Sequence, residues 1–117
     1  MTTTNISLPR PTDHAYDVSL LLVVELRRLV PVIARHDPDL ARQVKRAASS
    51  ISLNLREGLE RIGRDRIQHW RVAFGSAREV QAGLDIATLA GDLDEAAAAK
   101  AREYLDRVCA MLYRMTR

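Results

Sequence analysis

The segment 43–61 constrains the fold most strongly, because it places two different stripes on one helix. Its apolar residues recur at spacings of three and four, which is one face of an α-helix: Val44, Ala47, Ala48, Ile51, Leu55 and Gly58. Its polar residues recur at the same spacings, rotated by roughly a quarter turn. They are Gln43, Arg46, Ser50, Asn54, Glu57 and Arg61. A surface helix needs only one apolar face, so this helix is expected to bury two kinds of surface.

Helical patterns of similar length surround this segment. We expect helices over about residues 13–36, 38–61, 65–90 and 92–115, with Asp37, Asp65 and Asp92 at their starts and Gly63 and Gly91 between them. Pro38 suits a first helical position, and Gln68 and Glu95 have capping-box spacing. Short connections between helices of about twenty residues predict an all-α, antiparallel up-down-up-down four-helix bundle over residues 13–117. Residues 1–12 lack periodicity and are expected to form a mobile tail.

The first helix carries more apolar surface than a monomeric bundle requires. Its expected core line is joined by further apolar residues around most of the circumference, and Pro31 is expected to kink the helix without ending it. The core line is Tyr16, Leu20, Val23, Leu26, Val30 and Ile33. In the third helix, Gly75 and Gly83 cost about 1 kcal/mol each relative to Ala, which indicates close helix approach. The apolar excess predicts that copies of the chain associate.

Composition narrows the class of protein further. The chain has 117 residues, is 47% hydrophobic but only 4% aromatic, and contains one cysteine, Cys109. The length predicts one domain. The single cysteine, with no signal peptide and no apolar span of membrane length, predicts a protein of the reducing cytoplasm that does not bind a membrane. The net charge is +3, but residues 42–71 alone carry +5. Arg supplies sixteen of the eighteen basic residues, and guanidinium groups bind phosphate well, although a GC-rich genome produces the same bias.

Two spaced motifs resemble those of a known family. The run R-A-A-S-S-I-S-L-N-L-R-E-G-L-E-R and the later A-F-G-S-A-R-E-V are similar to the signature of the four helix bundle proteins. These are the intervening-sequence proteins of large-subunit ribosomal RNA genes, with a related branch in the accessory variability determinants of diversity-generating retroelements. The signature residues are Arg46, Ser50, Asn54, Glu57, Gly58, Arg61, Gly75, Ser76 and Glu79. Arg56 departs from the pattern, since the family usually has a small residue there.

The resemblance implies a fold and an assembly rather than a reaction. It covers about residues 39–92 well, and it implies a ring-shaped homo-oligomer, commonly a pentamer, with nucleic acid as a partner. The biochemical role of the family is poorly established. The sequence therefore predicts a non-enzymatic oligomeric scaffold without a cofactor. Two alternatives remain open: an adaptor for a protein partner, and a helical ribonuclease of the HEPN type.

Residues with catalytic chemistry are few. A di-iron bundle needs Glu-x-x-His pairs, and none of His14, His36 and His69 follows a Glu at that spacing. Cys109 has apolar neighbours and is interpreted as a small buried side chain. Arg64 and His69 have the spacing of the HEPN ribonuclease motif, but the interval spans an expected helix start. The sequence thus predicts no metal site and no catalytic residue.

The polar stripe has two interpretations, a ligand site or a satisfied network between the second and third helices. In a hairpin centred near Gly63, residues facing each other have numbers that sum to roughly 126. The stripe would then place Arg46 opposite Glu79 in an at least partly buried ion pair, Ser50 opposite Ser76, and Glu57 opposite His69. These pairs are complementary, which favours the network.

The remaining positions of these two helices are expected to face outward. On the second helix they include Ser49, Ser52 and Glu60, and on the third Asp85. The basic ones are candidate nucleic-acid contacts: Arg42, Lys45, Arg56, Arg71 and Arg78. They would bind phosphates of RNA or DNA, or they would form an ordinary solvated face, and the sequence leaves both interpretations open.

Overall fold

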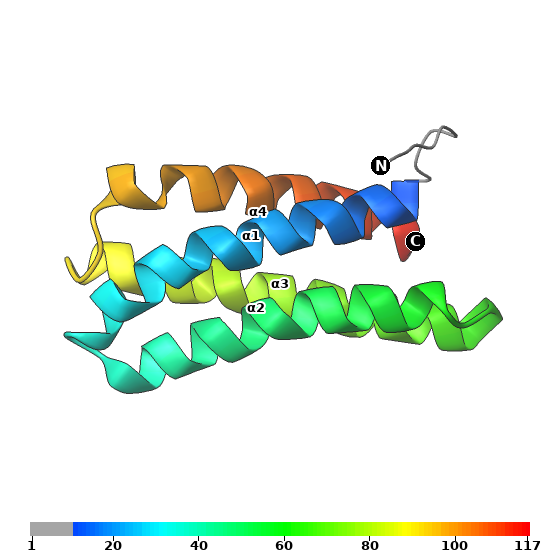
Figure 1. Cartoon of the computed structure of the whole chain (residues 1–117), viewed down its shortest axis with the longest axis horizontal. Coiled ribbons are helices and arrows are strands. Elements are labelled where there is room, and N and C mark those ends of the chain that lie inside the picture. Colours follow the sequence, from blue (N-terminus) through cyan, green and yellow to red (C-terminus); the bar gives the residue numbers. More distant parts are fainter. Residues whose placement is uncertain (1–10) are drawn as a thin grey trace, which may run out of the picture.

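Four α-helices make up the described part of the chain, residues 11–117, in the computed structural model. They are α1 (Pro11–Ala34), α2 (Pro38–Leu59), α3 (Gly63–Leu89) and α4 (Glu95–Met115). Consecutive helices run in opposite directions (Figure 1). Each helix packs on the next and α4 packs on α1, so α1 and α3 lie on one diagonal of the bundle. The predicted all-α four-helix bundle is confirmed.

The predicted tail, residues 1–12, lies outside the described residues except for its last two, which begin α1. α1 continues through Pro31 to Ala34, as the apolar period indicates. None of the described helices is long and apolar enough to span a membrane.

The start of α2 agrees with the sequence prediction. Asp37 is its N-cap, and the Asp37 carboxylate accepts a hydrogen bond from the Leu40 amide at 3.0 Å. Pro38 occupies the first helical position, where the missing N–H has no intrahelical partner to lose.

The two predicted capping boxes were wrong. α3 begins at Gly63, after Ile62 in an extended conformation, and no side chain caps it. Asp65 instead lies in the first turn and accepts a hydrogen bond from Arg61 at 3.0 Å. The N-cap of α4 is Asp94 rather than Asp92, again without a side-chain hydrogen bond. Gly63 and Gly91 do adopt the positive φ angles of 60° and 83° that the turns require.

The core confirms the apolar stripe of α2, all six residues of which are buried. In α1 the buried line is shifted from the predicted one. Leu26 and Ile33 are buried as predicted, but Leu20 is 41% exposed, while Val18, Leu22 and Leu29 are buried. The shift in α1 follows from its apolar residues surrounding the helix, which leaves the sequence pattern without a single preferred phase.

Ser52 was predicted to face outward and is buried instead, at 7% exposure. The Ser52 and Ser19 hydroxyls lie 2.8 Å apart between α2 and α1, and the Ser19 hydroxyl also donates to the Tyr16 carbonyl at 2.6 Å. A buried hydroxyl is tolerated where it finds a partner, and here the partner lies on a different helix.

Candidate functional site

The polar stripe of α2 meets α3 in a hydrogen-bonded seam, which we call the α2–α3 seam. The Ser76 hydroxyl donates to the Ser50 hydroxyl at 2.8 Å, and the Asn54 amide donates to the same hydroxyl at 3.1 Å. On the other side of Asn54, its carbonyl oxygen lies 3.2 Å from His69 Nδ1. The predicted pairing of Ser50 with Ser76 is confirmed. Because these groups satisfy one another, they join the helices without any ligand.

The predicted ion pair of Arg46 and Glu79 is absent from the described residues. Both residues are exposed, and together with Gln43, Ser50 and Ser76 they line a hollow of about 170 Å³ at the outer edge of the seam. The hairpin register was correct, but a register does not hold two long, hydrated side chains together. The prediction of a buried pair was therefore wrong, and Arg46 remains available at the surface.

Glu57 and Arg61 form a surface network at the end of α2 instead of facing His69. Arg61 donates to Glu57 at 2.6 Å and to Asp65 at 3.0 Å. These hydrogen bonds, the one to Glu57 first, raise the pKa of the Arg61 guanidinium. The predicted Glu57–His69 pair was wrong, because Arg61 pairs with Glu57 and Asn54 engages the imidazole.

Gly58 lets α3 approach α2 closely near the turn. A Cβ atom on Gly58 would lie 2.4 Å from Nε1 of Trp70, which is buried against it. Arg66 donates to the carbonyls of Gly58 and Leu59 at 2.9 and 3.1 Å, and its guanidinium lies 5.4 Å from the Trp70 ring centre. The guanidinium therefore satisfies two carbonyls at the end of α2 while stacking on the indole. These contacts fix the hairpin.

The two glycines inside α3 have opposite surroundings. A Cβ atom on Gly83 would lie 2.4 Å from Cγ2 of Val44, so this position requires glycine for close packing with α2. A Cβ atom on Gly75 would meet nothing within 4 Å, and Gly75 is exposed. The prediction of close helix approach is thus confirmed at Gly83 and wrong at Gly75 within the single chain.

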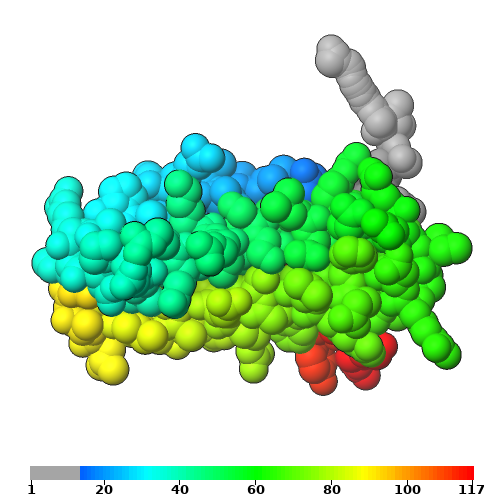
Figure 2. Space-filling model, turned by 90° about the horizontal axis from the view of Figure 1, so that it is seen from below, coloured from blue at the N-terminus to red at the C-terminus, as the bar shows by residue number. Residues whose placement is uncertain are grey.

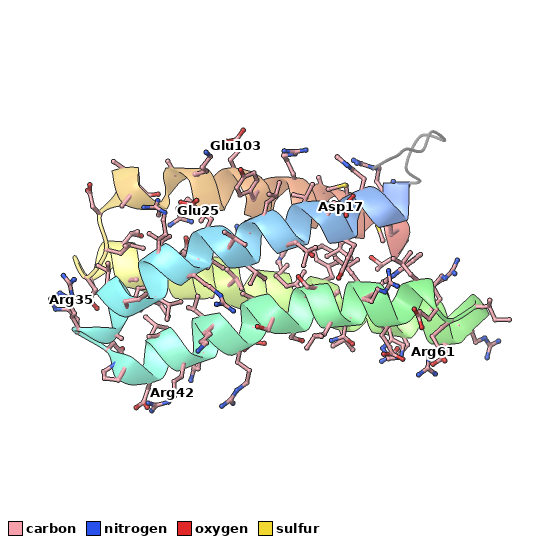
Figure 3. The ribbon with its side chains drawn as sticks, viewed as in Figure 1. Asp17, Glu25, Arg35, Arg42, Arg61 and Glu103 are labelled. Atoms are coloured by element: carbon pink, nitrogen blue, oxygen red, sulfur yellow. The ribbon has the colours of Figure 1, made fainter. Side chains whose placement is uncertain are left out.

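The candidate nucleic-acid contacts are divided between α2 and α3, which form one face of the molecule (Figure 2). Arg42 and Lys45 line a second hollow on the outer side of α2, together with Arg46. Its other lining residues are Ser49, Ser50, Leu53 and Asn54, so no carboxylate lines it. Figure 3 shows the Arg42 side chain projecting from α2, where it is paired with Asp39 in the preceding turn. Arg46 thus lies beside Arg42 and Lys45, two of the predicted nucleic-acid contacts.

The other three candidates lie apart from that hollow. Arg56 is 3.5 Å from Glu60, and its guanidinium lies 5.8 Å from the centre of the Tyr16 ring. Arg71 and Arg78 lie on the exposed side of α3, where Arg78 stacks over Phe74 at 5.5 Å.

A basic residue that sequence reasoning missed is Arg27 of α1. It lines an apolar groove between α1 and α2 with Lys45. No signal in the sequence reveals this proximity, because the two residues come from different helices.

The two residues with the spacing of the ribonuclease motif are not joined by a hydrogen bond within the described residues. Arg64 is exposed, and the His69 imidazole is engaged by Asn54. Burial raises the pKa of the half-buried Cys109 thiol, which disfavours the thiolate that a nucleophile needs. Within residues 14–117, no three His, Cys, Asp or Glu side chains gather as a metal-binding group.

The fold and the seam define a four-helix bundle whose second and third helices form a polar, glycine-containing hairpin. A sequence model of the 23S rRNA-intervening sequence proteins matches residues 14–114. The chain belongs to this family. No curated protein matches it.

A solved structure supports the same fold. It is the crystal structure of a protein with unknown function from the S23 ribosomal protein family of Bacteroides thetaiotaomicron. The two chains superpose with a TM-score of 0.80 at 19% sequence identity, over 88% of this chain and 98% of the other. At this identity the likeness concerns the fold alone.

Proposed function

We propose that the protein is a non-enzymatic oligomeric scaffold that binds the phosphates of nucleic acid through its basic surface. The observation that carries this proposal is the cluster of Arg42, Lys45 and Arg46 around one hollow on α2 that no carboxylate lines. Exposed guanidinium and ammonium groups gathered in this way attract phosphate. The name of the family, which refers to an intervening sequence in 23S rRNA, supports RNA as the partner.

Binding of this kind reads the backbone and not the base sequence. The basic residues project from the sides of packed helices, and Trp70 is buried, so it is not available to stack on a base. Each phosphate contact adds about 0.7 to 0.9 to the slope of log affinity against log salt. Three contacts per copy therefore give a slope of roughly 2 to 3.

Assembly multiplies these contacts through avidity. The outward side of α1 exposes Leu20, Leu21 and Val24 at 41%, 49% and 65%. Neighbouring apolar side chains at this level of exposure favour burial against another molecule. We propose that this molecule is a second copy of the chain, in a ring of five, the number that the family resemblance implies. A ring presents several basic hollows to one nucleic-acid strand.

The test is a titration of labelled single-stranded RNA and of duplex DNA at two salt concentrations. The double variant Lys45→Glu/Arg46→Glu should weaken binding to both and flatten the salt slope by roughly 1.4 to 1.8. The matched control is Lys100→Glu, a charge reversal at an exposed position of α4, which should leave the slope nearly unchanged. If no complex forms even at low salt, the nucleic-acid part of the proposal is wrong.

Two measurements address the alternatives. RNA cleavage that disappears in His69→Ala would favour the ribonuclease. A stoichiometric protein that co-purifies with the chain would favour the adaptor.

A further inference from the structure

The exposed side of α3 contains a notch that no contact among the described residues explains. A glycine inside a helix is less stable than an alanine by about 0.5 to 1 kcal/mol, and Gly75 has no neighbour that would collide with a Cβ atom. Apolar side chains follow the same side of the helix, with Val72 at 43% and Ile86 at 53% exposure. The notch and its apolar borders therefore suit a side chain from another molecule.

A second surface without a partner among the described residues lies on α1. It consists of Leu20, Leu21 and Val24, and Val24 is the most exposed of the three at 65%. α1 and α3 occupy one diagonal of the bundle, so the outward side of α1 is separate from that of α3. Two different patches allow a contact that repeats from copy to copy, which one self-complementary patch does not.

We propose that the outward side of α1 in one copy packs on the outward side of α3 in the next, with Val24 placed against Gly75. The inference rests on the proposed oligomer and names its interface. The knob is an exposed β-branched side chain, and the notch is a glycine at which the helices approach closely.

Charged residues on the two surfaces determine the relative direction of the helices. On α1, Asp17 precedes Val24 by seven residues and Arg28 follows it by four. On α3, Arg71 precedes Gly75 by four residues and Glu79 follows it by four. All four are exposed.

Only the parallel direction places opposite charges together at the Asp17 end of the contact. If the helices run parallel, Arg71 approaches Asp17 with an axial offset of about 5 Å. At the other end, Arg28 comes to the level of both Glu79 and Arg78, so that end is not selective. Arg28 is hydrogen-bonded to Glu25 at 2.6 Å, but its side chain remains 66% exposed and has further donors to offer. If the helices run antiparallel, Arg28 faces Arg71, which is repulsive. Charge therefore selects the parallel contact.

A parallel contact is also the one that a head-to-tail assembly requires. Within one chain α1 and α3 run in the same direction, with α2 and α4 opposed to them (Figure 1). Rotation about an axis along the bundle preserves these directions, so α1 of one copy meets α3 of the next in parallel. A two-fold axis across the bundle would reverse them. The charge pattern thus agrees with a head-to-tail contact between copies.

Cross-linking in a Cys109→Ser background tests the pairing. The double variant Asp17→Cys/Arg71→Cys, treated with a short bis-maleimide, should give a ladder of multimers on a denaturing gel. Asp17→Cys or Arg71→Cys alone should remain monomeric on the same gel. The control Asp17→Cys/Glu79→Cys places its thiols about 16 Å apart along the axis in the parallel contact and should not form a ladder.

Light scattering on the same samples separates the two proposals. A ladder from residues 17 and 71 in an oligomeric sample supports the interface. An oligomer without that ladder, or one in which a single variant cross-links to itself, overturns the pairing and leaves the oligomer standing. A monomeric mass for the unaltered protein overturns both.

A charge exchange provides a second test without cysteine. Asp17→Arg should raise the dissociation constant of the oligomer about fivefold, and adding Arg71→Asp should restore most of it. If the second substitution worsens the first, the pairing is wrong.

Discussion

The two sides of α3 contain similar residues but have different surroundings. The side facing α2 places Gly83 against Val44 and Ser76 against Ser50, so each small or polar residue has a partner. The outward side has a glycine of the same helix, Gly75, with open space around it, and apolar residues in contact with solvent. A partner within the chain explains the glycine on the inner side, whereas the described residues do not explain the one on the outer side, for which we propose a partner in another copy.

The largest expected effect comes from filling the inner notch with Gly83→Ala. The new Cβ atom would lie 2.4 Å from Cγ2 of Val44, a stiff β-branched side chain in the core. Overpacking of this kind costs about 1 to 3 kcal/mol, which lowers the melting temperature by roughly 4 °C per kcal/mol. Thermal unfolding followed by circular dichroism measures it. An unchanged melting temperature would show that the helices pack less closely than the structure indicates.

Removal of the inner hydrogen bond in Ser76→Ala should have the next largest effect. The variant loses the bond to Ser50, whose hydroxyl keeps the Asn54 amide as a partner. The expected loss is about 1 kcal/mol in the free energy of unfolding, measured with urea. Ser49→Ala, at an exposed position of α2, serves as the control and should change little. Equal losses in both variants would mean that the seam contributes nothing specific.

The same substitution on the outer side, Gly75→Ala, should have the opposite sign. The Cβ atom enters open space, so the dissociated chain should gain about 0.5 to 1 kcal/mol from helix propensity. Association should weaken at the same time, because the methyl group occupies the notch proposed for Val24. Urea unfolding at low concentration and sedimentation at high concentration measure the two effects. Gly75→Ala that destabilises the dissociated chain would contradict the comparison.

The smallest effect on stability is expected for Arg46→Ala. Arg46 is exposed and has no ion pair with Glu79, so the free energy of unfolding should change by less than about 0.5 kcal/mol. Binding of RNA should nevertheless weaken, with a salt slope lower by about 0.7 to 0.9. A loss of several kcal/mol would instead support the buried ion pair with Glu79 that the sequence predicted.

Much of the packing between α2 and α3 was predictable from the sequence. The apolar period of α2 identified six of its nine buried residues, because a strict spacing of three and four leaves one phase for the helix. The hairpin register followed from the turn near Gly63 and paired Ser50 with Ser76 correctly. Ser50 and Ser76 have short side chains, so the register of the two helices is enough to bring their hydroxyl groups together.

The remaining features depend on contacts between side chains, which the spacing of residues in the sequence does not show. The polar character of Ser52 suggested an outward position, because its partner Ser19 lies on another helix. The capping-box spacing at Asp65 was real, but Arg61 holds that carboxylate, and the helix starts two residues earlier. Arg46 and Glu79 share a hollow without meeting, since long charged side chains gain little from a surface pair.

The mass of the native protein in solution tests the central claim, that the outward sides of α1 and α3 are covered by other copies of the chain. Multi-angle light scattering on a size-exclusion column, from micromolar concentration upward, gives it directly. The account predicts a multiple of 13.1 kDa, with the multimer reduced by Gly75→Ala and by Val24→Asp but not by Lys100→Glu. A mass of 13.1 kDa at every concentration would contradict it.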